Sequence, residues 1–177
     1  MGTMSLILVT PLSAMPEMMR TYQPSHLITL LSPEFMIETP GGFPPGRHLR
    51  LAVNDICDPA LGPCPPDEEH VSELIEFAHS WDAKRPLLVH CWAGVSRSMA
   101  ATYAILCDRA WKGAEFRIAR EIRARAPHAR PNRLLVRLAD NYLDREGRMI
   151  QAVEEMGSGI TVEEGQPVEF PLADFGL

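Results

Sequence analysis

A thiol and a guanidinium lie at opposite ends of one short segment, with Cys91 near its start and Arg97 six residues later. A thiolate is a strong nucleophile. A guanidinium is a planar fork that pairs with two phosphate oxygens at once, which Lys cannot do. Cysteine and arginine at this spacing often coincide by chance, as a buried apolar cysteine and a surface arginine at a helix start. The flanking residues therefore decide between the two interpretations.

Those flanking residues predict a buried strand before the pair and a central helix after it. Leu87-Leu88-Val89 is an unbroken apolar run, and residues 96–109 are apolar almost all round. A tight loop between such elements can turn its backbone N–H groups inward at the positive end of the helix dipole, where a phosphate dianion binds. Gly94 supplies the backbone freedom for the turn. The predicted phosphate-binding residues are Trp92, Ala93, Gly94, Val95, Ser96 and Arg97.

Three further roles follow from position in this segment. The positive surroundings favour the thiolate form of Cys91, which makes it the predicted nucleophile. Ser98 can donate a hydroxyl hydrogen bond to the sulfur, which favours thiolate both as attacking and as leaving group. His90 can orient the loop through a hydrogen bond to backbone near Cys91.

The segment from His90 to Ser98 resembles the signature His-Cys-x-x-Gly-x-Ser-Arg-Ser of the dual-specificity branch of the protein tyrosine phosphatases, without a departure. The resemblance extends upstream through residues 49–55 and downstream through residues 130–135. It implies a two-step reaction in which the cysteine takes the phosphoryl group and an aspartic acid protonates the leaving oxygen. The same carboxylate then activates water, and no metal or other cofactor is needed.

The acid must come from a separate loop, and three aspartates precede the cysteine. Asp55, Asp58 and Asp67 lie 36, 33 and 24 residues before Cys91. Asp55 is favoured because it comes just past the end of a predicted strand, as the acid usually does in the family. Asp58 stays open, since the turn-rich residues 58–66 make the spacing longer than expected for the smallest members. Asn132 after Pro131 is a plausible helix cap, and the resemblance suggests that it also supports the phosphate loop.

Alternating strand and helix patterns predict an α/β fold with a central, mainly parallel sheet of four to five strands, flanked by helices. Bounded apolar runs predict the strands. Helical spacing follows them, with prolines and acids at the start of the first helix. The predicted strands cover residues 6–10, 27–31, 48–53 and 86–90, and the predicted helices cover residues 65–81, 96–109, 114–126 and 132–144.

Composition indicates one globular domain with an acidic end. The chain has 177 residues, of which 46% are hydrophobic and 23% charged, and no apolar run is long enough to span a membrane. Its formal charge of −6 comes from residues 151–177, which contain six acids and no Lys or Arg. We therefore expect a catalytic domain over residues 1–150 and an acidic C-terminal extension over residues 151–177. This extension is either disordered or folds back through residues 168–170.

The remaining charged and sulfur-containing residues leave alternatives open. Eleven of the 17 basic residues lie between Arg109 and Arg148, either as solvated helix faces or as a positive face for anionic substrates. His48 and Arg50 are expected as exposed strand residues, with substrate contact as the alternative. The other cysteines are too sparse for a disulfide framework, so we expect a reducing cytoplasm. Packing or incidental surface positions are expected for Cys57, Cys64 and Cys107, with a protective disulfide to oxidised Cys91 as the alternative.

We therefore expect a phosphoric monoester hydrolase that acts on phosphotyrosine, with phosphoserine and phosphothreonine left open, through a phosphocysteine intermediate. Its partner is a phosphorylated protein or a small phosphoester, without nucleic acid or membrane, and the oligomeric state stays open. A phosphoinositide or inositol phosphate phosphatase is the nearest alternative, although such enzymes usually carry extra basic side chains in the loop. A weakly active phosphate-binding module is another, and a rhodanese or arsenate reductase is the most remote.

Overall fold

The computed structural model describes residues 5–177 and contains a five-stranded sheet in the order β3-β2-β4-β1-β5. The first four strands are parallel, and β5 runs antiparallel to β1 at one edge. This confirms the predicted α/β fold with a mainly parallel sheet. The strands are β1 (Leu6–Pro11), β2 (His26–Leu31), β3 (His48–Ala52), β4 (Leu87–Cys91) and β5 (Val168–Pro171).

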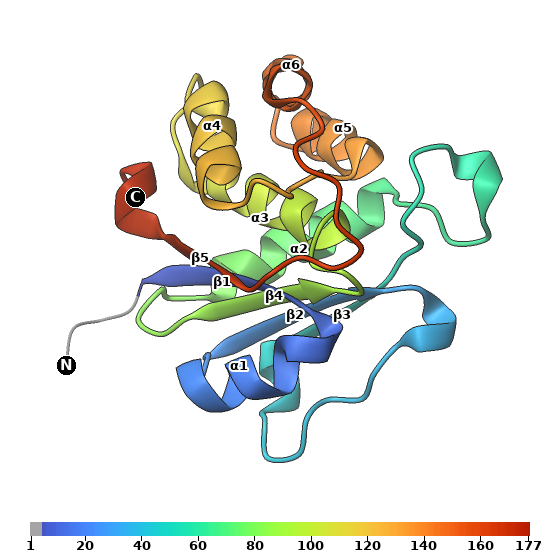
Figure 1. Cartoon of the computed structure of the whole chain (residues 1–177), viewed down its shortest axis with the longest axis vertical. Coiled ribbons are helices and arrows are strands. Elements are labelled where there is room, and N and C mark those ends of the chain that lie inside the picture. Colours follow the sequence, from blue (N-terminus) through green and yellow to red (C-terminus); the bar gives the residue numbers. More distant parts are fainter. Residues whose placement is uncertain (1–4) are drawn as a thin grey trace.

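Helices cover both faces of the sheet unequally (Figure 1). The helices α2 (Glu68–Ser80), α3 (Arg97–Arg109), α4 (Glu115–Arg125), α5 (Arg133–Tyr142) and α6 (Arg148–Met156) lie on one face. On the other face lies α1 (Met15–Tyr22), whose methionines pack on Leu8, Leu27 and Leu88. The sequence patterns did not predict α1 or α6, which are short helices of eight and nine residues. Among residues 5–177, no helix has the length and apolar character to cross a membrane.

The central helix α3 is enclosed by the rest of the fold. Every residue from Arg97 to Cys107 is buried, so the helix has no solvent-facing side over most of its length. It packs against β4, β1 and β2 below and against α2, α4 and α5 around it. Small residues such as Ala100, Ala101 and Ala104 allow these neighbours to approach closely. The predicted central position of this helix is thereby confirmed.

The acidic C-terminal residues fold back onto the sheet. Figure 1 shows the chain after α6 running across α3 to β5, which pairs with β1 through Val168 to Pro171. Phe170 and Phe175 are fully buried, and their rings lie 6.2 Å apart between centroids. Of the two alternatives for this segment, the structure therefore has the one in which it folds back.

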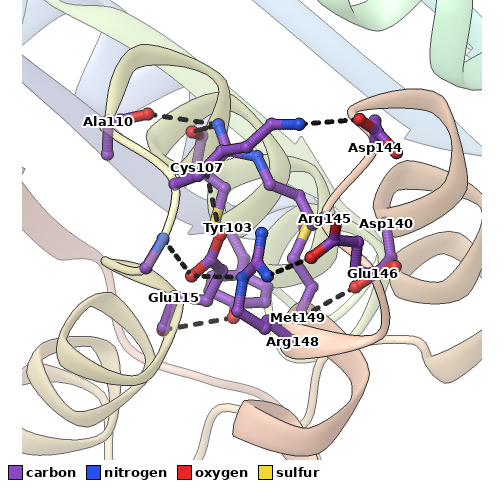
Figure 2. A network of polar contacts seen from close by, with 12 residues as sticks. Tyr103, Cys107, Ala110, Glu115, Asp140, Asp144, Arg145, Glu146, Arg148 and Met149 are labelled. Atoms are coloured by element: carbon purple, nitrogen blue, oxygen red, sulfur yellow. Dashed lines mark hydrogen bonds and ion pairs between the residues drawn. The ribbon is translucent and has the colours of Figure 1, made fainter.

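A buried ion cluster holds the far end of α3 (Figure 2). The fully buried Glu115 accepts from Arg145 at 3.0 Å and lies 3.5 Å from Nε of Arg148. Burial by itself raises the pKa of Glu115, but its hydrogen bonds and the Arg145 guanidinium outweigh burial and hold that pKa below its ordinary value. Arg145 also donates to the carbonyls of Cys107 and Ala110 at the end of α3. A cation there complements the negative end of the helix dipole.

The basic stretch from Arg109 to Arg148 is therefore not simply a set of solvated helix faces. Several of its side chains donate to backbone carbonyls of other segments, and this ties the helices together. The donors are Arg109 to Ala78 and Trp81, Arg117 to Phe175, Arg123 to Met156, Ala126, Pro127 and Gly157, and Arg145 to Cys107 and Ala110.

Removing the buried cation should be costly. We expect Arg145→Ala to lower the free energy of unfolding by about 3–5 kcal/mol, because it leaves Glu115 buried without its main partner. Lys112→Ala, which removes an exposed ion pair with Asp144, is the control and should cost less than about 1 kcal/mol. Urea unfolding followed by circular dichroism measures both variants. Equal small losses would show that the cluster does not hold α3.

Candidate active site

The loop between β4 and α3, residues 92–96, is called the phosphate loop below. It lies against the end of β1. Cys91 is the last residue of β4 and Arg97 the first of α3, so only five residues make the turn. Gly94 has φ +69, and a Cβ there would lie 2.7 Å from the Pro11 nitrogen and 2.9 Å from the Thr10 carbonyl carbon. Only glycine fits this conformation and this contact. The loop thus curls tightly around the N-terminus of α3.

Cys91 lies at the bottom of a cleft of about 450 Å³ at the N-terminus of α3. Its side chain is only 1% exposed, and its Sγ lies 3.1 Å from Oγ of the fully buried Ser98. The sulfur therefore lies at the positive end of the helix dipole, next to a hydroxyl that can donate a hydrogen bond to it. The cleft is lined by Asp55, Cys57, Cys91, Trp92, Ala93, Val95, Ser96, Arg97, Arg130, Val162 and Glu163.

One short hydrogen bond fixes the Arg97 guanidinium in the cleft that also contains Cys91. Its Nη1 donates to the carbonyl of Val53 at 2.8 Å and contacts Oγ of Ser32 at 3.4 Å. Its Nε is buried and has no acceptor among residues 5–177. A buried guanidinium N–H without an acceptor is costly, and an oxyanion in the adjoining cleft would supply one. The geometry therefore fits an anion between the guanidinium and the loop backbone.

Asp55 is brought to the same cleft from the loop after β3. Its Oδ1 accepts hydrogen bonds from Oγ of Ser96 at 2.6 Å and from Nδ2 of Asn132 at 2.9 Å. Its Oδ2 has no hydrogen bond to any residue that the structure describes. One carboxylate oxygen is thus fixed by two donors, and the other has no partner among residues 5–177.

The two other aspartates are engaged elsewhere. Asp58 accepts from the backbone nitrogen of Ala60 at 3.0 Å in the following turn. Asp67 caps α2, where its Oδ1 accepts from the backbone nitrogen of His70 at 3.0 Å. Neither lines the cleft. Asp58 thus begins a short 3-10 turn, and Asp67 begins α2.

Asn132 joins three parts of the site. Its Oδ1 accepts from the backbone nitrogen of Leu135 at 3.0 Å and so caps α5. Its Nδ2 donates to Asp55 and, at 3.1 Å, to the carbonyl of Ile56. Its backbone nitrogen donates to the carbonyl of Ser96 at 3.3 Å. The start of α5 therefore fixes the loop that carries Asp55 relative to the phosphate loop.

Known proteins are similar to this chain in structure, but none has a significant match to it in sequence. No model of a protein family matches the chain, and no curated protein has a significant sequence match to it. The crystal structure of PTPMT1 in complex with PI(5)P superposes with a TM-score of 0.58 at 17% identity, covering 86% of this chain and 97% of that one. DUSP15 gives a TM-score of 0.58 at 18% identity, with 90% and 97% covered. The fold is that of a dual-specificity-type protein tyrosine phosphatase.

A third structure places the chain among the same folds. The PTP-2 phosphatase of Cydia pomonella has a TM-score of 0.54 at 18% identity, over 76% of this chain and 84% of that one. The shared phosphatase fold accounts for the strand, loop and helix that position Cys91 and Arg97. At these low identities the likeness concerns the fold, and the chemistry has to be argued from the side chains of this chain.

In this phosphatase fold His90 contacts a threonine side chain and also the backbone at Cys91, where a hydrogen bond raises its pKa against the effect of burial. Its Nε2 lies 2.7 Å from Oγ1 of Thr29, which also lies 2.8 Å from Nε2 of His48. Burial lowers the pKa of His90 and that of His48 to about 4, so both rings are neutral at pH 7. The predicted exposure of His48 is wrong, since it is buried and also bonds Thr39, whereas Arg50 is exposed.

The four cysteines are free, and of the other three only Cys57 lines the cleft that contains Cys91. Cys57 is exposed and lines the same cleft. Cys64 is half-buried, and its Sγ contacts the carbonyl of Ala52 at 3.4 Å. Cys107 is buried inside α3, where burial raises its pKa. Packing accounts for Cys107, and Cys57 is the thiol that the fold brings to the cleft.

Residues that the sequence analysis did not assign to the site also line the cleft. Val162 and Glu163 come from the acidic segment after α6, and Arg130 comes from the loop before α5. The backbone nitrogen of Arg130 donates to the carbonyl of Val95 at 2.9 Å, so this loop contacts the phosphate loop directly. Nothing in the spacing of Val162 or Glu163 indicates a place near Cys91, because an irregular segment carries no periodic signal.

Gly94→Ala tests the packing of the phosphate loop on β1. The added methyl meets Pro11 at 2.7 Å in a left-handed conformation, so we expect a loss of about 2 kcal/mol or more in the free energy of unfolding. Tungstate should no longer raise the melting temperature, because the loop can no longer close around it. Gly46→Ala is the control, since nothing lies within 4 Å of its added Cβ. A Gly94→Ala variant with wild-type stability and tungstate response would contradict this packing.

Proposed function

We propose that this protein is a cysteine-dependent phosphatase that hydrolyses phosphomonoesters, phosphotyrosine in proteins foremost, through a phosphocysteine intermediate. The observation that carries the proposal is one cleft that contains the Cys91 thiol, the Arg97 guanidinium and the Asp55 carboxyl group. A weakly active phosphate-binding module would not need all three groups in one place. The phosphatase fold of the similar structures supports the same reaction class.

In the first step the Cys91 thiolate attacks phosphorus, the S–P bond forms and the bond from phosphorus to the leaving oxygen breaks. Asp55 donates its proton from Oδ2, the oxygen without a hydrogen bond in the part of the chain that the structure describes, to the departing oxygen. The Arg97 guanidinium and the loop N–H groups bind the equatorial phosphate oxygens. These interactions strengthen as charge redistributes in the transition state.

In the second step water attacks the phosphocysteine. The Asp55 carboxylate takes a proton from that water, the S–P bond breaks, and phosphate and the Cys91 thiolate are released. Ser98 lies 3.1 Å from Sγ and can donate to the departing thiolate, which makes it a better leaving group. The proposed reaction uses no metal or other cofactor.

An aromatic rim favours a phosphorylated side chain that carries a ring. Trp92 lines the cleft and is 52% exposed, and its ring lies 5.1 Å from that of the equally exposed Phe35. Such a pair offers an apolar surface for the phenyl ring of phosphotyrosine or for apolar residues next to it. We propose a phosphorylated protein as the partner, and the cytoplasm as the location because a free thiol persists there.

A phosphoinositide is the second candidate substrate. The observation in its favour is the likeness to PTPMT1, whose crystal structure is in complex with PI(5)P. The cleft of this chain has Arg97 and Arg130 as its cations, and Asp55 and Glu163 oppose them. The remaining loop side chains, from Trp92 to Ser96, are uncharged. This balance favours one phosphate group over several, so the phosphoinositide ranks second.

Hydrolysis of an aryl phosphate tests the proposed reaction class. With EDTA present, we expect the wild-type protein to release phosphate from para-nitrophenyl phosphate and vanadate to inhibit it competitively. Cys91→Ser should abolish turnover, because a hydroxyl is a far weaker nucleophile than a thiolate at this pH. Hydrolysis that persists in Cys91→Ser would exclude the covalent mechanism.

A matched set of aspartate variants tests the general acid. Asp55→Asn should lower kcat by about two to four orders of magnitude, the usual span for a lost proton donor. Asp58→Asn and Asp67→Asn remove the same charge from neighbouring positions and keep their caps, because Asn caps helices as well as Asp. Both should turn over at nearly the wild-type rate. If Asp58→Asn is the slow variant, the acid is misassigned.

A further inference from the structure

The acidic segment of residues 160–166 contributes Val162 and Glu163 to one wall of the cleft. It leaves α6, passes the phosphate loop and leads to β5, and each of its ends is fastened to a different part of the fold (Figure 1). It is therefore a fixed part of the site's rim. The fastening contacts are Ile160 N to Pro127 O at 2.9 Å, Gly165 N to Ala93 O at 2.8 Å, and Ser13 Oγ to Glu164 Oε1 at 2.8 Å.

Close packing at Gly165 keeps this segment against the phosphate loop. A Cβ at Gly165 would lie 2.6 Å from Nε2 of His128 and 3.2 Å from the carbonyl oxygen of Gly94. A side chain at position 165 would therefore displace His128 and press on the loop. Two residues earlier, Glu163 lines the cleft that contains Cys91 and Arg97. The backbone of this part of the segment is thus held against the loop, and Glu163 projects from it at the cleft.

Glu163 is the carboxylate of this segment that has no partner among residues 5–177. Its neighbours Glu164 and Glu169 bond to Ser13 and Tyr22, whereas Glu163 is exposed and has no hydrogen bond or ion pair with residues 5–177. Arg130, which also lines the cleft, donates to Oγ1 of Thr161 at 3.3 Å and so is partly occupied by the same segment. A group that lies beside the bound phosphate therefore meets an unpaired carboxylate.

We infer that Glu163 is a specificity-determining residue that selects phosphorylated protein segments with Lys or Arg next to the phosphorylated residue. The inference rests on the proposed phosphatase activity. One phosphate is bound by Arg97 and the loop N–H groups at the helix N-terminus. A cationic neighbour then pairs with Glu163, whereas a second phosphate or an acidic neighbour is repelled by it. The same repulsion disfavours polyphosphorylated inositol headgroups.

Two phosphotyrosine peptides that differ only in the residues flanking the phosphotyrosine, Lys in one and Glu in the other, test this role. Wild type should favour the Lys peptide in kcat/KM by about threefold or more, the usual strength of one partly solvated charge pair. Glu163→Gln should bring the ratio close to one, and Glu163→Lys should reverse it. The wild-type preference should shrink in high salt.

Glu155→Gln is the matched control, because Glu155 is an exposed residue of α6 that does not line the cleft. It removes the same charge from the same acidic end of the chain, so it should retain both the wild-type rate on para-nitrophenyl phosphate and the wild-type peptide ratio. Equal ratios in wild type and Glu163→Gln, or equal shifts in both Gln variants, overturn the inference.

Vesicles that contain PI(5)P test the second candidate substrate, a phosphoinositide. If they are hydrolysed with a higher kcat/KM than the Lys peptide, selection by Glu163 for a protein segment is wrong. The two proposals fail in different ways. An active enzyme that does not distinguish the peptides overturns only the role of Glu163, whereas a wild-type protein that hydrolyses no phosphoester overturns the phosphatase proposal and this inference with it.

Discussion

The contact between Gly94 and the end of β1 is the constraint on which the cleft depends. The loop must curl around the N-terminus of α3 so that its N–H groups face one point, and it can do so only because no side chain separates Gly94 from Pro11. Behind the loop, α3 is buried along most of its length, and only its N-terminal end meets the cleft. Arg145 donates to carbonyls at the other end of α3, and both ends of the helix are therefore held.

The second requirement is that an acid from a distant loop faces the proposed nucleophile. Asp55 meets it through two side chains, Ser96 of the phosphate loop and Asn132 at the start of α5. Each of these residues also has a structural role. Asn132 caps α5, and the carbonyl of Ser96 accepts a hydrogen bond from the backbone nitrogen of Asn132. The contacts that build the fold and the contacts that position the acid are thus partly the same. The C-terminal segment contacts the loop through Gly165 and Ala93 and adds Val162 and Glu163 to the lining of the cleft.

Much of this site could be predicted from the sequence because its elements are local. Cys91, Gly94 and Arg97 lie within one turn between a strand and a helix, and apolar patterns predict both elements. Asp55 could be favoured but not separated from Asp58, since a carboxylate that caps a turn and one that lines a cleft look alike in a sequence. The buried Glu115 was not foreseen, because a charged residue in an Arg-rich helix is typical of a solvated face. Val162 and Glu163 were missed since only the long-range path of the chain places them at the cleft.

The central claim is that Cys91 forms a covalent bond to phosphorus. Rapid quenching in acid during turnover of an aryl phosphate, followed by mass spectrometry of the digested protein, tests it most directly. The account predicts a mass increase of one phosphoryl group on the peptide that contains Cys91, and a larger trapped fraction when Ser98 is replaced by Ala, because the thiolate then leaves less readily. Turnover without a phosphorylated Cys91 peptide, or a phosphoryl group on another residue, would contradict the account.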